Sequence, residues 1–121
     1  MLIFHVADPA HWEASTGTGS YTVSTLDVSL DEEGFIHCSC LEQLDDVLRL
    51  VYGRVHEDQT LLVIDTDRLS APWQFDDVPG ADQSYPHVYG PLNPDAVIVT
   101  APIRRTGNTW VVGWEPADVT D

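Results

Sequence analysis

The chain has no lysine, only two cysteines and no long apolar stretch. Its five arginines stand against 20 aspartates and glutamates, which gives a formal net charge of −15. A chain this acidic repels polyanions at long range, so a nucleic-acid backbone is a poor partner. No segment approaches the length of a membrane span, and the apolar start is too short and too uncharged for a signal peptide. We therefore expect no nucleic-acid partner, no membrane partner and a cytoplasmic location.

The two cysteines, Cys38 and Cys40, lie two positions apart in one strand-like stretch. On an extended chain they point to the same face, in a geometry poorly suited to a disulfide between them. We expect free thiols in a reducing compartment. A two-cysteine metal site would need a turn and a second pair, and the sequence has neither. It also has no phosphate-cradling glycine loop, no dinucleotide fingerprint and no Gly-x-Ser-x-Gly elbow.

The 121 residues, 43% of them hydrophobic, suit one globular domain over residues 1–121. Helical periodicity predicts a main helix at about residues 40–52, with a capping box of Ser39 and Glu42 and an end at Gly53. A short N-terminal helix is expected after Asp8 and Pro9, and a single helical turn or a plain turn at 29–34.

Alternation and apolar runs predict strands at 2–7, 21–26, 35–40, 60–65, 73–77, 86–90, 96–103 and 109–114. The strand at 60–65 is expected to be central, the last two strands to form a hairpin, and the polar end, 115–121, to be frayed. The fold class is α+β, with more strand than helix.

Three of the strand-like stretches carry a histidine on the face opposite an apolar one, because side chains alternate along a strand. His5 opposes Phe4 in the first stretch, and His37 opposes Cys38 in the second. If the three stretches adjoin, their polar side chains would line one cleft of the kind that binds small ligands: His5, His37, Ser39, Tyr85, His87 and Tyr89. Each histidine taken alone is more often structural, and Ser39 is also explained as a helix cap.

The stretches "FHVADPAHWEA", "GFIHCS" and "YPHVYGPL" resemble the bacterial family called domain of unknown function 952. The resemblance runs from the first strand to about residue 103. It implies similarity to the ADP-ribosyltransferase superfold: a split β-sandwich of two small, mainly antiparallel sheets with a cleft that holds NAD. The stretch "FIHCS" is also similar to a strand of the RNA 2′-phosphotransferase branch, which uses NAD as well.

The resemblance also implies roles for these residues. His5 would bind a ribose of NAD, and His37 and Ser39 would stand at the second motif, against the nicotinamide ring. Tyr85, His87 and Tyr89 would replace the third motif, where most such transferases carry a glutamate. We expect His37, His87 and Tyr89 to be catalytic, and His5, Ser39 and Tyr85 to bind the ligand.

Two features of the sequence depart from this pattern. No acidic residue stands at the third motif, and no arginine lies inside any of the motifs. Three hypotheses therefore stay open. The first is that the chain is an NAD-dependent transferase, and the second is that it is a nucleotide-binding module without turnover. The third is that His5, His37 and His87 form a metal site. We rank them in that order, with NAD as ligand or substrate and no metal expected. The protein is expected to be a monomer or a homodimer.

Overall fold

The computed structural model describes residues 1–116, and its larger sheet has four antiparallel strands in the order β1-β3-β6-β7. These strands are β1 (Leu2–Ala7), β3 (Gln59–Asp65), β6 (Val97–Thr106) and β7 (Thr109–Val112). The four apolar side chains at 61–64 of β3 are fully buried, as expected for a strand covered on both faces. The predicted central strand and the predicted hairpin of the last two strands are both confirmed. Most of the polar end, residues 117–121, lies outside the described range.

A smaller antiparallel sheet has the order β2-β5-β4, built from β2 (Ile36–His37), β5 (Ser84–Val88) and β4 (Trp73–Asp77). One backbone bridge joins the two sheets: Phe4 and Ser39 exchange both N–H···O bonds at 2.8 Å. Just before it, the N–H of Cys38 donates to the carbonyl of Pro86 on β5. The segment after β2 therefore fastens the small sheet to the edge of the large one, and the predicted α+β split sandwich is confirmed.

The first two helices begin where the sequence indicated, after Asp8 and within the segment 29–34. Helix α1 (Pro9–Thr18) starts where the Asp8 carboxylate accepts the N–H of Ala10, and it ends at Gly19. Helix α2 (Leu30–Glu33) has a capping box between Ser29 and Glu32. Gly34 closes α2 with φ of 93°, a left-handed conformation that costs glycine little. The chain then turns directly into Phe35 and β2.

The predicted helix at 40–52 is shorter and begins differently. A 3-10 turn, η1 (Leu41–Gln43), leads into α3 (Leu44–Leu50). The capping box predicted for Ser39 and Glu42 is wrong, because the Gln43 side chain accepts the backbone N–H of Cys40 instead. Ser39 is held in the sheet bridge, so the helical turn starts one residue later. Two further 3-10 turns, η2 (Thr66–Arg68) and η3 (Pro94–Ala96), connect strands.

The strand predicted at 21–26 is also wrong. This segment makes only two isolated bridges, Tyr21 with Leu92 and Val23 with Ser29. The chain turns back on itself here, since the N–H of Ser24 donates to the carbonyl of Val28 and Leu26 has φ of 57°. Alternation was present, but no neighbouring strand runs far enough alongside it to form a ladder.

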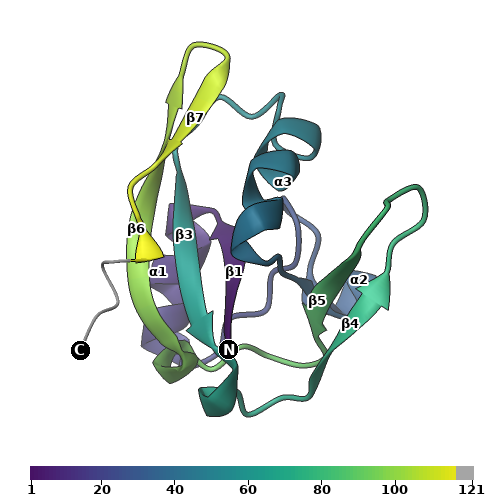
Figure 1. Cartoon of the computed structure of the whole chain (residues 1–121). Coiled ribbons are helices and arrows are strands. Elements are labelled where there is room, and N and C mark those ends of the chain that lie inside the picture. The colour runs from purple at the N-terminus through teal and green to yellow at the C-terminus, as the bar shows by residue number, and fades with distance from the viewer. Residues whose placement is uncertain (117–121) are drawn as a thin grey trace.

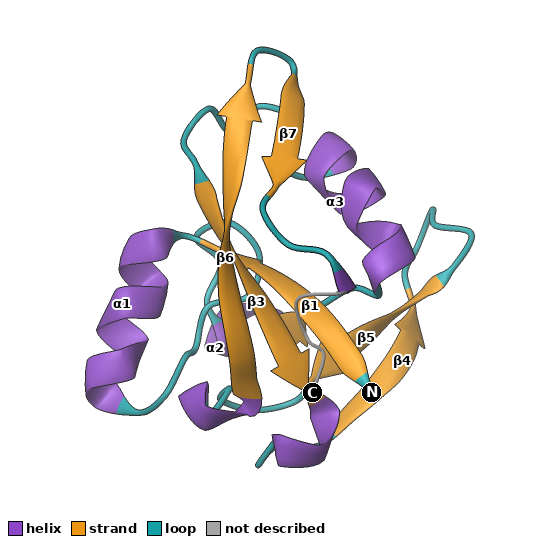
Figure 2. Ribbon diagram, turned by 60° about the vertical axis from the view of Figure 1, so that its left-hand side comes forward, coloured by secondary structure: helices purple, strands orange, loops and turns teal. Residues whose placement is uncertain are grey.

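Helices α1 and α3 cover opposite faces of the large sheet (Figures 1 and 2). On the α3 side, one core contains Phe4, Leu48, Leu61 and Trp114. On the α1 side, a second core joins the large sheet to the small one through residues such as Ile3, Ile36, Leu62 and Val88. Both cysteines are free thiols, as predicted. Within residues 1–116, no helix is both long enough and apolar enough to cross a membrane.

Candidate functional site

The small sheet has one apolar face and one polar face. Ile36, Val88 and Trp73 pack into the core shared with the large sheet. The strand registers place His37 and Gln74 on either side of His87, and Asp76 opposite Tyr85. Because paired residues share a face, these polar side chains all lie on the side away from that core: His37, Gln74, Asp76, Tyr85 and His87. This face of the small sheet thus carries a row of polar side chains, four of them titratable.

A chain of hydrogen bonds runs along this face. Nδ1 of His37 lies 3.1 Å from Nε2 of His87, and Nδ1 of His87 lies 2.8 Å from Oδ2 of Asp76. The hydroxyl of Tyr89 donates to the same carboxylate oxygen, and the amide of Gln74 donates to Oδ1 at 2.6 Å. We call the His37–His87–Asp76 series the histidine relay. It connects three side chains from three different strands into one unit.

Aromatic rings hold the relay in place. The Phe35 ring stacks on His87 with centroids 3.9 Å apart and planes 12° apart. Tyr85 packs against His37 at 5.3 Å, and Tyr89 packs against Phe35 at 5.7 Å. The imidazoles therefore have restricted orientations, which is what an acid–base group needs in order to act on a bound molecule.

The environment shifts the pKa values of the two ends of the relay, His37 and Asp76. Burial, then the neighbouring His87 and His5, lowers the pKa of His37 from 6.5 to about 4. Hydrogen bonds from Tyr89 and then Gln74 lower the pKa of Asp76, and the Asp76 carboxylate in turn raises the pKa of Tyr89. At neutral pH the relay therefore has an ionised carboxylate at one end and a neutral imidazole at the other.

A cavity of about 700 Å³ opens beside the relay, and we call it the Phe35 pocket. Its walls include Phe35, His37, Val51, Asp76, His87 and Tyr89. Two further carboxylates, Glu33 and Asp77, also line it, and none of the lining residues is an arginine. The pocket is of the size that holds a small organic ligand, with apolar walls and a few polar groups.

His5 belongs to β1 of the large sheet, and its side chain lies on the face opposite that of Phe4. The bridge between Phe4 and Ser39 puts these two residues on the same side, so the alternation along β1 directs His5 to the opposite side. Its Nδ1 bonds the carbonyl of His37 at 2.7 Å and its Nε2 bonds the Tyr21 hydroxyl at 2.9 Å. Burial lowers the pKa of His5 to about 4. The expected meeting of three imidazoles in one cleft is therefore not formed.

This placement also bears on the predicted three-histidine metal site. The relay brings together His37 and His87, while both ring nitrogens of His5 are engaged elsewhere. Among residues 1–116, no group of three or more histidine, cysteine or acidic side chains is arranged to hold a metal ion. The geometry gives this alternative no support.

Of the remaining candidate residues, one lines the Phe35 pocket and two do not. Tyr89 lines the Phe35 pocket with the relay. Tyr85 is half-buried behind His37, and Ser39 is buried in the bridge between the sheets. Their predicted roles as ligand contacts would need a ligand that reaches past His37.

Two residues of the site were missed in the sequence. Asp76 sits in the stretch "WQFDD", where alternation puts Gln74 and Asp76 on one face and Phe75 on the other. That signal was available, but only the pairing of β4 with β5 shows that this polar face adjoins His87. The sequence predicts Phe35 as the first residue of a strand, but in the structure it precedes β2 and stacks on His87.

Comparison with known proteins identifies the family. The model of the family described as "Protein of unknown function (DUF952)" matches residues 6–100, most of the chain, so the protein belongs to this family. No curated protein matches the sequence.

Two solved structures share the fold. Both are X-ray structures of protein CC0527 from Caulobacter crescentus, one of them a double mutant. Each has a TM-score of 0.76 and covers 98% of this chain and 96% of its own. The sequence identities are 23% and 22%, so the likeness extends to the fold alone.

Proposed function

We propose that this member of the family is an enzyme that binds a small molecule with a planar ring in the Phe35 pocket and exchanges a proton with it through His37. The observation that carries the proposal is the histidine relay along the wall of a cavity of about 700 Å³. Acid–base groups of this kind contribute roughly 10²–10⁴-fold to a rate.

The direction of the relay follows from the ionised Asp76. Its carboxylate can only accept, so Nδ1 of His87 carries the proton of that bond and Nε2 of His87 keeps a lone pair. Nδ1–H of His37 donates to that lone pair, which leaves the lone pair of His37 on Nε2. When Nε2 takes a proton from a ligand, the proton on Nδ1 passes to His87. The positive charge then rests beside the Asp76 carboxylate, where it is stabilised.

The lining charges select the ligand. Three carboxylates and no arginine line the pocket, so a polyanionic group would be repelled from it. A flat ring would stack on the aromatic walls, and a positive charge on that ring would be attracted by the carboxylates.

The nicotinamide–ribose end of NAD has these properties, and its pyrophosphate would have to stay outside the Phe35 pocket. We therefore propose NAD or an ADP-ribose-like nucleotide as the first ligand to test, with transfer chemistry like that of ADP-ribosyltransferases. Asp76 would supply the carboxylate that the third motif lacks. As the bond from ribose to nicotinamide breaks, nicotinamide leaves with the electron pair and that carboxylate would stabilise the positive charge that develops on the sugar. A water molecule or an acceptor hydroxyl would form the new bond to the same sugar carbon and give up its proton to Nε2 of His37.

A binding module without turnover is the second candidate. The Asp76 carboxylate already accepts hydrogen bonds from Tyr89, Gln74 and His87. Three hydrogen bonds to one carboxylate are as consistent with a structural role of Asp76 in the pocket wall as with a catalytic role. The two candidates differ only in whether a product is formed.

The test is incubation with NAD, ADP-ribose and nicotinamide riboside, followed by thermal unfolding and by chromatography for released nicotinamide. We expect NAD and nicotinamide riboside to raise the melting temperature by mass action, and nicotinamide to be released. His37→Gln should keep the binding and lower the release about 10²–10⁴-fold. His56→Gln, an exposed histidine outside the pocket, is the matched control and should change neither.

The outcomes separate the candidates. Binding without released nicotinamide would leave the binding module. If millimolar NAD and nicotinamide riboside neither raise the melting temperature nor yield nicotinamide, NAD is excluded as the ligand. If His37→Gln and His56→Gln release nicotinamide equally well, His37 is not the acid–base group.

A further inference from the structure

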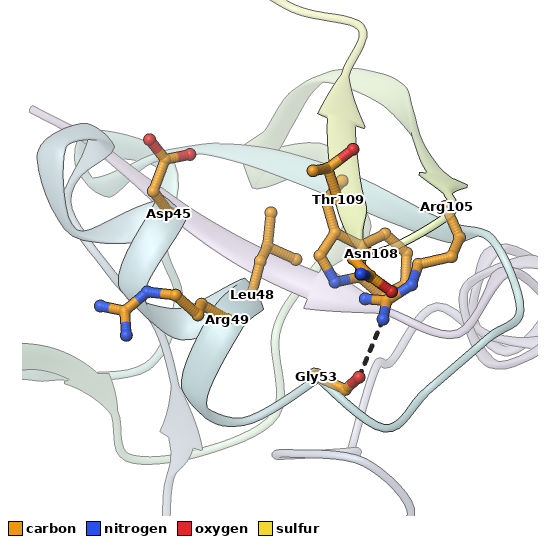
Figure 3. A pocket seen from close by; sticks show the side chains of 8 residues that line it. Asp45, Leu48, Arg49, Gly53, Arg105, Asn108 and Thr109 are labelled. Atoms are coloured by element: carbon orange, nitrogen blue, oxygen red, sulfur yellow. Dashed lines mark hydrogen bonds between the residues drawn. The ribbon is translucent and has the colours of Figure 1, made fainter.

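A second hollow, of about 460 Å³, lies between α3 and the hairpin of β6 and β7. Figure 3 shows Asp45 and Arg49 on the helix side, Arg105 and Asn108 on the hairpin side, and Leu48 between them. None of these residues lines the Phe35 pocket. The hollow is therefore a separate place on the molecule.

Positive charge is scarce in this chain, yet two of its five arginines line this hollow. The backbone holds the Arg105 guanidinium in one orientation. Its Nε donates to the carbonyl of Gly107 at 3.0 Å and one terminal nitrogen donates to the carbonyl of Gly53 at 2.9 Å. Its Cζ lies 4.8 Å from the centre of the Trp110 ring. A guanidinium fixed in this way loses little freedom on binding a ligand.

The charge of Arg105 has no carboxylate partner in the described part of the chain, because no acidic side chain there comes within 4.0 Å of its guanidinium. The Asp58 carboxylate accepts the backbone N–H of Arg105 and not its side chain. Gly53 and Gly107 supply neutral carbonyl oxygens. In a molecule of net charge −15, this half-buried cation keeps donors for an anion.

Two neighbouring groups offer further donors. The indole N–H of Trp110 is buried and has no hydrogen-bond acceptor within residues 1–116. Buried donors are rarely left in this state, and Trp110 is one of the residues that line the hollow. The Asn108 side chain is exposed and makes no hydrogen bond in the same range. The hairpin side of the hollow is thus rich in donors.

The helix side limits how much negative charge the hollow accepts. Asp45 lines it, and Arg49 is paired with Asp46 at 2.7 Å. A polyphosphate would meet Asp45 and the field of the whole acidic chain, whereas a single carboxylate meets the fork of Arg105. Leu48 and the Trp110 ring provide apolar contact for the rest of such a molecule. We propose that this hollow binds the carboxylate group of a small organic monoanion, with Arg105 as its main partner.

Benzoate is a suitable probe, titrated into ¹⁵N-labelled protein at constant ionic strength, with chloride and inorganic phosphate as the comparison anions. The expected result is a saturable shift of the Arg105 Nε–H and the Trp110 indole N–H with benzoate, and no such shift with chloride. Arg105→Gln should weaken benzoate binding at least tenfold. Arg104→Gln removes the same charge from an exposed neighbour on the same strand and should change the affinity less than twofold.

Asp45→Asn keeps the test decisive if Arg105→Gln does not fold, because it should strengthen benzoate binding severalfold while leaving Arg105 in place. Shifts that are linear and unsaturated, or equal with chloride, would overturn the proposal. It would equally be overturned if Arg104→Gln weakened binding as much as Arg105→Gln, or if phosphate bound more tightly than benzoate.

Discussion

His5 and His37 have the same lowered pKa, about 4, but they stand in different surroundings. His5 is sealed beneath the sheet, with both ring nitrogens bonded to protein atoms. His37 borders a cavity and is joined through His87 to a carboxylate. A lowered pKa therefore marks burial in both cases, and only the second case combines it with space for a ligand and a path for a proton.

If this contrast is right, removing His5 should cost far more stability than removing His37. His5→Ala leaves the Tyr21 hydroxyl and the His37 carbonyl without their partner, at about 1–3 kcal/mol for each buried group. His37→Ala leaves one side-chain nitrogen, Nε2 of His87, without its partner, but beside an existing cavity, and should cost about 1 kcal/mol, near the centre of values for single substitutions. Urea unfolding of both variants measures the difference. Equal losses would show that the two histidines are not distinct.

The second test of the contrast is the pH dependence of stability. In the folded protein His5 stays neutral down to about pH 4, whereas in the unfolded chain it takes up a proton near pH 6.5. The unfolded state thus binds more protons in this window, so stability falls as pH drops from 6.5 to 4. The loss from His5 is roughly 3 kcal/mol. Urea unfolding of the wild type and of His5→Gln across this window should show a flatter profile for the variant. An unchanged slope would contradict the assignment.

A smaller effect is expected at the relay itself. Tyr89→Phe removes the largest of the hydrogen bonds that lower the pKa of Asp76, so that pKa should rise toward its usual range. Tyr89 is exposed on the surface, and the free energy of unfolding should barely change. The carboxyl ¹³C shift of Asp76, followed during an acid titration, reports the change. Tyr85→Phe is the matched control, because its ring packs on His37 without bonding Asp76.

The sequence was enough to predict the features that depend on local pattern. The apolar run at 61–64, the Asp8 cap and the final hairpin all appeared where expected. The strand at 21–26 failed because alternation alone does not provide a neighbour to pair with. The cap at Ser39 failed because a sheet bridge held that residue.

In the site, too, the features that depend on local pattern were predicted and those that depend on long-range pairing were not. Alternation correctly placed His37, Tyr85 and His87 on one face. Whether His5 joins them depends on how the two sheets meet, and one bridge at Phe4 decides that it does not. Asp76 became part of the site through the register of β4 on β5, a long-range pairing that a single sequence does not reveal.

The most direct test is the side-chain nitrogen NMR spectrum of ¹⁵N-histidine-labelled protein, which reports the tautomer and the titration of each ring. With Asp76 ionised at neutral pH, His37 and His87 should both carry their proton on Nδ1, and His37 should stay neutral until about pH 4. Asp76→Asn should alter the nitrogen shifts of His87 and of His37 beyond it, while leaving those of His5 in place. If His37 titrates near pH 6.5, or if its shifts do not respond to Asp76→Asn, the three side chains do not act as one unit.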